Sequence, residues 1–163
     1  MKRLATLAIL SILSLFVLAI LSTGGLSLTK VPFLSFGDDI KLSGTAFDQK
    51  TLDQVSKITE LTFPAGTQGL EYAYFGSGID DSMVAKIRIP AGKKEEFMTN
   101  LPFASDDGTA PFPIMGHGQP WWKPDTLTER SAAEKTLPNE RPLAVIIGHQ
   151  GGEVIVYVTW SCT

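Results

Sequence analysis

An uninterrupted apolar stretch near the N-terminus, Leu4 to Leu21, constrains this chain more than any other feature. Its eighteen residues carry no charge, and the basic pair Lys2–Arg3 stands immediately before it. A membrane-spanning helix needs about 20 apolar residues, whereas the apolar core of a signal peptide has roughly 7–15. The stretch therefore predicts either an uncleaved membrane anchor, which we favour, or a signal peptide that is cut after Gly24.

The position of the basic pair predicts the orientation of the chain. Positive charges that flank a membrane helix remain in the cytoplasm. Lys2 and Arg3 therefore predict a single-pass membrane protein with its N-terminus in the cytoplasm and the rest of the chain outside. Residues 1–24 are the anchor or signal peptide, residues 25–39 a tether, and residues 40–163 an extracytoplasmic domain. If the signal peptide is cleaved, the same domain is secreted.

Composition limits the nature of that domain. The 139 residues from Gly25 to Thr163 suffice for one domain with a hydrophobic core. Without Lys2 and Arg3, 12 of the 14 basic residues remain against 17 acidic ones, a net charge of −5. Nucleic acid is not an expected partner, because phosphate binding needs a concentrated positive face. A single cysteine, Cys162, excludes a disulfide within the chain.

Hydrophobic patterns predict one small α+β domain. Alternating apolar residues indicate the two strands of a first hairpin, and apolar runs that occupy both faces indicate the two strands of a second. These strands are 70–74, 83–89, 143–147 and 154–160. The spacing of Leu52, Val55 and Ile58 predicts one helix, a second is expected at 92–100, and residues 40–47 are a weaker candidate for a short edge strand. After the membrane helix, we therefore expect a mainly antiparallel four-stranded sheet covered by one or two helices.

The connection from Asn100 to about Glu140 has no clear strand pattern, although Thr126–Lys135 is a candidate for one or two helical turns. Its prolines are Pro102, Pro111, Pro113, Pro120, Pro124 and Pro138, and its aromatic residues are Phe103, Phe112, Trp121 and Trp122. Loops longer than about 12–15 residues are usually functional or disordered. Because disordered segments contain few aromatic residues, we expect an ordered loop that packs on the sheet.

Four side chains of this loop form the candidate binding site: Trp121, Trp122, His117 and Phe112. Tryptophans that keep one face exposed are frequent anchors for a binding partner. The alternative interpretation is that both indole rings fill the core beneath the loop. The sequence leaves both interpretations open.

No pattern in the chain predicts a metal site, a cofactor or a catalytic residue. Zinc sites use three or four protein ligands, and His117 and His149 are the only histidines. The pairs Asp80–Asp81 and Asp106–Asp107 lack the alternating spacing of a calcium loop. Binding is therefore favoured over catalysis, and the sequence does not decide whether the protein is an enzyme.

Short motifs between residues 60 and 161 carry a resemblance to known proteins. They are Leu-Thr-Phe-Pro-Ala-Gly-Thr at 61–67, Gly-Ile-Asp-Asp at 78–81, Ile-Pro-Ala at 89–91, Glu-Phe at 96–97, Leu-Pro-Phe at 101–103 and Trp-Trp-Lys-Pro at 121–124. In this order they resemble small exported or lipid-anchored proteins of the bacterial cell envelope. Such proteins commonly carry a lipid-accepting cysteine near the N-terminus, which this chain lacks. The resemblance implies a domain of the bacterial cell envelope, and it implies no activity and no catalytic residue.

Two functional hypotheses follow from these observations. The first is a membrane-anchored extracytoplasmic module that binds an envelope protein or polymer through the loop around Trp121 and Trp122. The second is a hydrolase that acts on an envelope polymer with aspartate and histidine side chains from separate loops. A flat exposed aromatic surface favours the first hypothesis, and a cleft that brings those acidic and imidazole groups together favours the second.

Overall fold

The computed structural model describes residues 39–77, 80–101, 116 and 118–162. The predicted membrane helix or signal peptide and nearly all of the predicted tether lie outside these residues. None of the described helices is long and apolar enough to cross a membrane.

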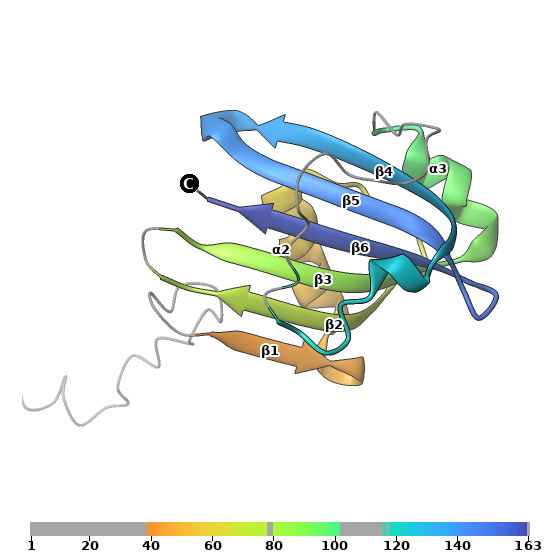
Figure 1. Cartoon of the computed structure of the whole chain (residues 1–163), viewed down its shortest axis with the longest axis horizontal. Coiled ribbons are helices and arrows are strands. Elements are labelled where there is room, and N and C mark those ends of the chain that lie inside the picture. Colours follow the sequence, from red (N-terminus) through yellow and green to blue (C-terminus); the bar gives the residue numbers. More distant parts are fainter. Residues whose placement is uncertain (1–38, 78–79, 102–115, 117, 163) are drawn as a thin grey trace, which may run out of the picture. The chain divides into compact units, whose positions relative to one another are not determined.

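Six antiparallel strands form one sheet in the order β1-β2-β3-β6-β5-β4. The strands are β1 (Ile40–Ser43), β2 (Gln68–Phe75), β3 (Ser82–Ile89), β4 (Thr128–Leu137), β5 (Arg141–Gln150) and β6 (Glu153–Ser161). The helices are α2 (Gln49–Thr59) and α3 (Lys94–Met98), with single 3₁₀ turns η1 (Gly44–Ala46), η2 (Ala91–Lys93), η3 (Pro124–Thr126) and η4 (Pro138–Glu140). Figure 1 shows α2 behind the sheet and the segment that contains η3 in front of it.

The predicted four-stranded α+β sheet is wrong, because the sheet has six strands and the described helices are two short ones. The two predicted hairpins are confirmed as β2–β3 and β5–β6. The two additional strands lie at the two edges of the sheet. β1 is a four-residue strand within the segment that was the weaker candidate, and β4 covers most of Thr126–Lys135, where helical turns were expected.

Residues of β4 form a strand and not the expected helical turns because they pair with β5. Its sequence, TERSAAEKTL, is rich in alanine, glutamate, lysine and arginine, which favour helices. Pairing with β5 along nearly the whole length of the strand overrides that preference. Ala132 and Ala133 are 5% and 3% exposed, so the small apolar side chains of the strand are covered on both faces.

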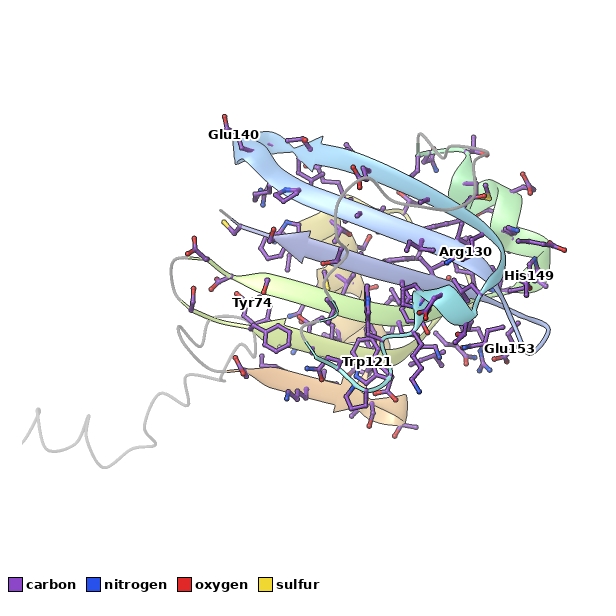
Figure 2. The ribbon with its side chains drawn as sticks, in the orientation of Figure 1. Tyr74, Trp121, Arg130, Glu140, His149 and Glu153 are labelled. Atoms are coloured by element: carbon purple, nitrogen blue, oxygen red, sulfur yellow. The ribbon has the colours of Figure 1, made fainter. Side chains whose placement is uncertain are left out.

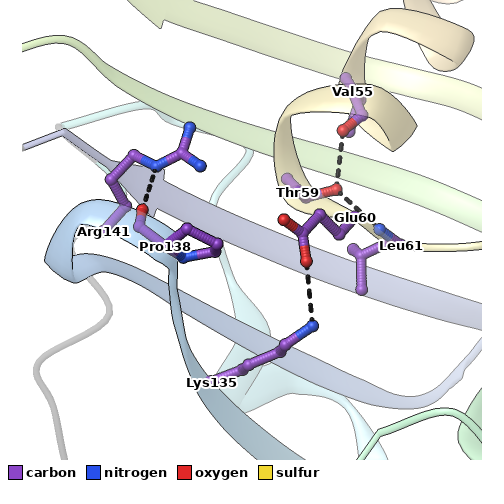
Figure 3. Close-up of polar contacts among 7 residues, drawn as sticks. All are labelled: Val55, Thr59, Glu60, Leu61, Lys135, Pro138 and Arg141. Carbon is purple, nitrogen blue, oxygen red and sulfur yellow. Dashed lines mark hydrogen bonds and ion pairs between the residues drawn. The ribbon is translucent and has the colours of Figure 1, made fainter.

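Helix α2 begins and ends with identifiable capping contacts. The Asp48 carboxylate accepts a hydrogen bond from the backbone N–H of Thr51 at 2.9 Å, which satisfies one free amide of the first turn. At the other end Glu60 adopts a left-handed conformation with φ of 57°. Its carboxylate forms an ion pair with Lys135 of β4 at 3.2 Å (Figure 3). The C-terminus of α2 is therefore attached to the edge strand.

The two faces of the sheet differ in what covers them. On the helix face, which carries Tyr72, Val156 and Val158, the Phe47 ring lies 5.4 Å from the Tyr72 ring just before α2 begins. These strand residues are at most 1% exposed. The opposite side, here called the tryptophan face, carries Lys86 and Tyr157, which are cross-strand neighbours. The main hydrophobic core therefore lies between the helix face and α2.

A bulge in β2 places Leu70 on the tryptophan face. The register shifts between Gly69 and Glu71, so Leu70 is the extra residue of the strand. Simple alternation places Leu70 beside Tyr72 on the helix face. The structure instead packs Leu70 against the hydrophobic cluster that surrounds Tyr157.

We predict that Gly69→Ala destabilises the domain. A Cβ atom at this position would lie 2.2 Å from Cγ of Phe47, whose side chain is 3% exposed and has little room to move. Overpacking of this kind costs about 1–3 kcal/mol. Chemical denaturation should show that loss, whereas Gly92→Ala should stay within about 0.5 kcal/mol of the native chain, because its Cβ would meet no atom within 4 Å. Equal stability of the two variants would contradict the packing described for Phe47.

Tyr72→Phe provides a second test of the core. The Tyr72 hydroxyl is buried and has no hydrogen-bond partner among the described residues. Removal of an unpaired buried hydroxyl should leave the free energy of unfolding at pH 7 unchanged or raise it by about 1 kcal/mol. A loss of more than 1 kcal/mol would show that the hydroxyl has a partner.

The same variant should change the stability at alkaline pH. Burial raises the pKa of the Tyr72 phenol, so the unfolded chain loses this proton first as the pH rises above about 10. The contribution of the Tyr72 phenol to the free energy of unfolding is fully present below about pH 10 and is lost as the pH rises further. Tyr72→Phe should therefore show a shallower decrease in unfolding free energy between pH 9 and 11.

Candidate binding surface

Trp121 and Trp122 lie on the tryptophan face of the sheet. Both rings are partly buried and pack against a cluster on that face, whose buried members are Leu127, Ala132, Ile146, Ile155 and Tyr157. The Trp122 ring centroid lies 5.1 Å from that of Tyr157 in an edge-on arrangement, and the Trp121 ring stands 5.9 Å from Trp122. Figure 2 shows Trp121 in front of the strands. Each indole therefore has one side on the sheet and another part in contact with solvent.

Local turns position the two indoles. The backbone N–H of Trp122 donates to the carbonyl of Gln119 at 3.0 Å, and the N–H of Gln119 donates to the carbonyl of Gly116 at 2.8 Å. A Cβ atom on Gly116 would lie 2.1 Å from Cγ of Trp122, so the indole rests directly against the Gly116 backbone. The turn η3 follows and leads to Leu127, which is 5% exposed. Residues 118–127 of the predicted loop are therefore ordered on the sheet.

Polar side chains form a connected network beside the aromatic rings. Lys86 Nζ donates to Oε1 of Gln150 at 2.8 Å, and Nε2 of Gln150 donates to Oγ1 of Thr126 at 2.7 Å. The same ammonium lies 5.6 Å from the centroid of the Tyr157 ring, within range of a cation–π contact. Burial raises the pKa of the Tyr157 phenol above its ordinary value. The network links three segments, β3, β5 and η3, around one aromatic ring.

A cavity of about 480 Å³ lies between the start of β2 and the segment that contains η1 and the first turn of α2. Its apolar lining includes Phe47, Leu52 and Leu70, and Leu70 also contacts the cluster beneath the tryptophans. The guanidinium of Arg88 lines the cavity and is paired with Glu153 and with the side-chain amide of Gln68. Pockets that hold small molecules or parts of larger ligands typically have volumes of about 300–1,000 Å³. Leu70 therefore belongs both to the cavity lining and to the side chains that pack against the cluster on the tryptophan face.

Two of the four residues in the predicted site, Phe112 and His117, lie outside the described residues, so their relation to the tryptophans stays a prediction. The structure adds side chains that the sequence analysis did not assign to the site: Lys86, Arg88, Gln150 and Tyr157. Of these four, only Lys86 and Arg88 have a signal in the sequence, because charges on alternate residues of β3 indicate a polar face. Their proximity to Trp121 depends on strand order, which the sequence does not encode locally.

The predicted hydrolase stays a prediction, because Asp106, Asp107 and His117 lie outside the described residues. Among the described residues, Asp81 and His149 lie far apart. Asp81 immediately precedes Ser82, which pairs with Ser161 at the end of β6, whereas His149 pairs with Val154 at its beginning. Seven residues of strand separate the two ends by about 23 Å. His149 instead lies 3.5 Å from the Glu129 carboxylate and 3.4 Å from the Lys94 ammonium. Within residues 39–77, 80–101, 116 and 118–162, no group of three or more side chains has a metal-ligating arrangement.

Comparison with known proteins does not place the chain in a family. No protein-family model, no curated protein and no solved structure matches it. The assignment of function therefore rests on the residues and geometry of this chain.

The two tryptophans should contribute unequally to stability. Trp122 contacts Gly116, Tyr157 and Trp121, and its indole nitrogen is buried. We expect Trp122→Ala to lower the free energy of unfolding by about 2–4 kcal/mol, somewhat less than for a fully buried tryptophan. Trp121→Ala should cost about 1 kcal/mol, since its ring meets the Trp122 ring edge-on and is farther from the core than Trp122. Equal losses in urea denaturation would show that both rings belong to the core.

Proposed function

We propose that this chain is a membrane-anchored, extracytoplasmic binding module of the bacterial cell envelope and that the tryptophan face is its contact surface. The apolar stretch from Leu4 to Leu21 supports the anchor, and the basic pair before it supports the orientation. The observation that carries the proposal is the partly exposed pair Trp121–Trp122, which packs on the tryptophan face against the cluster that includes Tyr157.

The energetics of indole burial support a binding role for Trp121. A tryptophan side chain can bury about 150–250 Å². If a partner covers about 50 Å² of the partly exposed ring, the gain is about 1.3 kcal/mol at 25 cal/mol per Å². That gain corresponds to roughly tenfold in affinity. One ring can therefore contribute substantially to a contact of moderate strength.

The polar groups around the rings support recognition rather than proton transfer. Lys86 is engaged by Gln150, and Arg88 by Glu153 and Gln68, so these cations already have partners before a ligand arrives. Such paired side chains are pre-organised, which reduces the entropy that binding must overcome. A surface of this kind fits an envelope protein or polymer that presents apolar and hydrogen-bonding groups together.

Trp121→Ala should abolish capture of the partner without unfolding the domain. The experiment is in-cell cross-linking of the full-length membrane protein followed by affinity purification. Trp121→Phe should retain part of the capture, because a smaller aromatic ring preserves some of the contact. Lys57→Ala, a change on α2, should retain all of it.

The outcome also identifies the class of partner. A cross-linked adduct that protease removes is a protein, and one that resists protease but is cleaved by glycan hydrolases is a polymer. A partner captured equally by native protein and by Trp121→Ala would overturn the assignment of this surface.

A further inference from the structure

The cavity of about 480 Å³ exists because β1 is shorter than its neighbour β2. Ser43, the last residue of β1, pairs with Glu71, whereas β2 already begins at Gln68. At Gly44 the chain takes a φ of 54° and turns from β1 into η1. Residues 68–70 of β2 therefore have no residue of β1 beside them, and they form one wall of the cavity.

Apolar side chains line the cavity from two sides. Phe47 and Leu52, which are 3% and 2% exposed, line it just before α2 and in the first turn of that helix. Leu70, the extra residue of the β2 bulge, is partly exposed and lines it from the strand. Binding sites for small molecules are lined mainly by apolar side chains with a few placed polar groups. The cavity therefore offers hydrophobic contacts to an alkyl or aryl group.

Arg88 supplies a positive charge to the wall that β2 and β3 form. A guanidinium presents five N–H donors in a fixed plane. One donor of Arg88 goes to the Glu153 carboxylate and another to the side-chain carbonyl of Gln68, and no other acceptor for them lies in the described part of the chain. The remaining N–H groups can therefore bind a ligand, and a carboxylate is the group that accepts two parallel N–H bonds from a guanidinium.

Gln68 adds hydrogen-bond donors beside Arg88. Its carbonyl oxygen is used by the guanidinium, which leaves the side-chain NH₂ group for other acceptors. Gln68 and Arg88 are cross-strand neighbours, and both line the cavity. The wall therefore combines N–H donors with a positive charge, and this combination selects a ligand group that is negatively charged and accepts hydrogen bonds.

One acidic side chain, Asp48, also lines the cavity, but its carboxylate is already engaged. Its Oδ1 accepts from the backbone N–H and from the hydroxyl of Thr51, at 2.9 and 2.8 Å. These hydrogen bonds hold the pKa of the Asp48 carboxyl below its ordinary value. Asp48 therefore serves as the cap of α2, and its charge opposes a bound anion less than direct hydrogen bonds from Arg88 favour one.

We propose that this cavity binds a small carboxylic acid with an apolar body. The carboxylate pairs with Arg88 and Gln68, and the alkyl or aryl group lies against Phe47 and Leu70. The site does not depend on the partner of the tryptophan face, because neither tryptophan of that surface lines the cavity.

Isothermal titration calorimetry tests the site with three probes that share a benzyl group and differ in their polar group: phenylacetate, phenylethanol and phenethylamine. The full-length protein is placed in lipid nanodiscs, and empty nanodiscs give the blank for partition of each probe into lipid. Phenylacetate should show saturable binding to the protein. Phenylethanol and phenethylamine should bind at least about tenfold more weakly, because neither carries a carboxylate for the guanidinium.

Three variants locate the carboxylate. Arg88→Gln should weaken phenylacetate binding at least about tenfold, because glutamine removes the charge and the paired N–H donors. Asp48→Asn should strengthen it about two- to fivefold, since asparagine still caps α2 while a negative charge leaves the cavity wall. The matched control Arg141→Gln changes the same residue type at the start of β5, outside the cavity lining, and should leave the affinity unchanged.

Circular dichroism should show that each variant is folded, and the gain expected for Asp48→Asn cannot arise from unfolding. Four results would each overturn the proposal: a phenylacetate isotherm equal to that of empty nanodiscs, equal affinities for phenylacetate and phenethylamine, unchanged binding by a folded Arg88→Gln variant, or weaker binding by Asp48→Asn.

Discussion

The pairing of β3 with β6 is the interaction on which the rest of the structure depends. It joins two halves of the chain, the strands β1 to β3 and the strands β4 to β6, through eight consecutive residue pairs from Ser82–Ser161 to Ile89–Val154. Most of these residues are nearly or completely buried. Each half alone would leave a long apolar strand with an unpaired edge, so neither half satisfies its backbone groups without the other.

This central pairing also creates the two faces of the sheet. The helix face packs against α2 and forms the main core, while the tryptophan face brings Lys86 of β3 beside Tyr157 of β6. The segment before β4 then crosses that second face and sets Trp122 against the Tyr157 ring at 5.1 Å. The Trp122 ring and the Lys86 ammonium therefore share one support, the Tyr157 ring in the middle of the sheet.

The sequence predicted those parts of the fold that depend on neighbouring residues. The strands of β2–β3 and of β5–β6 were found because alternation and turn residues are local signals, and α2 was found from apolar residues at helical spacing. β4 was missed because its composition favours a helix and only β5 makes it a strand. Of the predicted site, Trp121 and Trp122 lie on the sheet together, whereas Phe112 and His117 are outside the described residues.

The sequence by itself determined the apolar stretch from Leu4 to Leu21, the absence of an internal disulfide, the two hairpins and the concentration of aromatic residues before β4. Only the tertiary structure decided that the Trp122 ring lies against Tyr157 and that Lys86, which is bonded to Gln150, lies over the same tyrosine ring. It also decided that β4 is an edge strand with ten residues. The physical reason is that strand order arises from contacts between residues distant in sequence, whereas propensity and periodicity report only on neighbours.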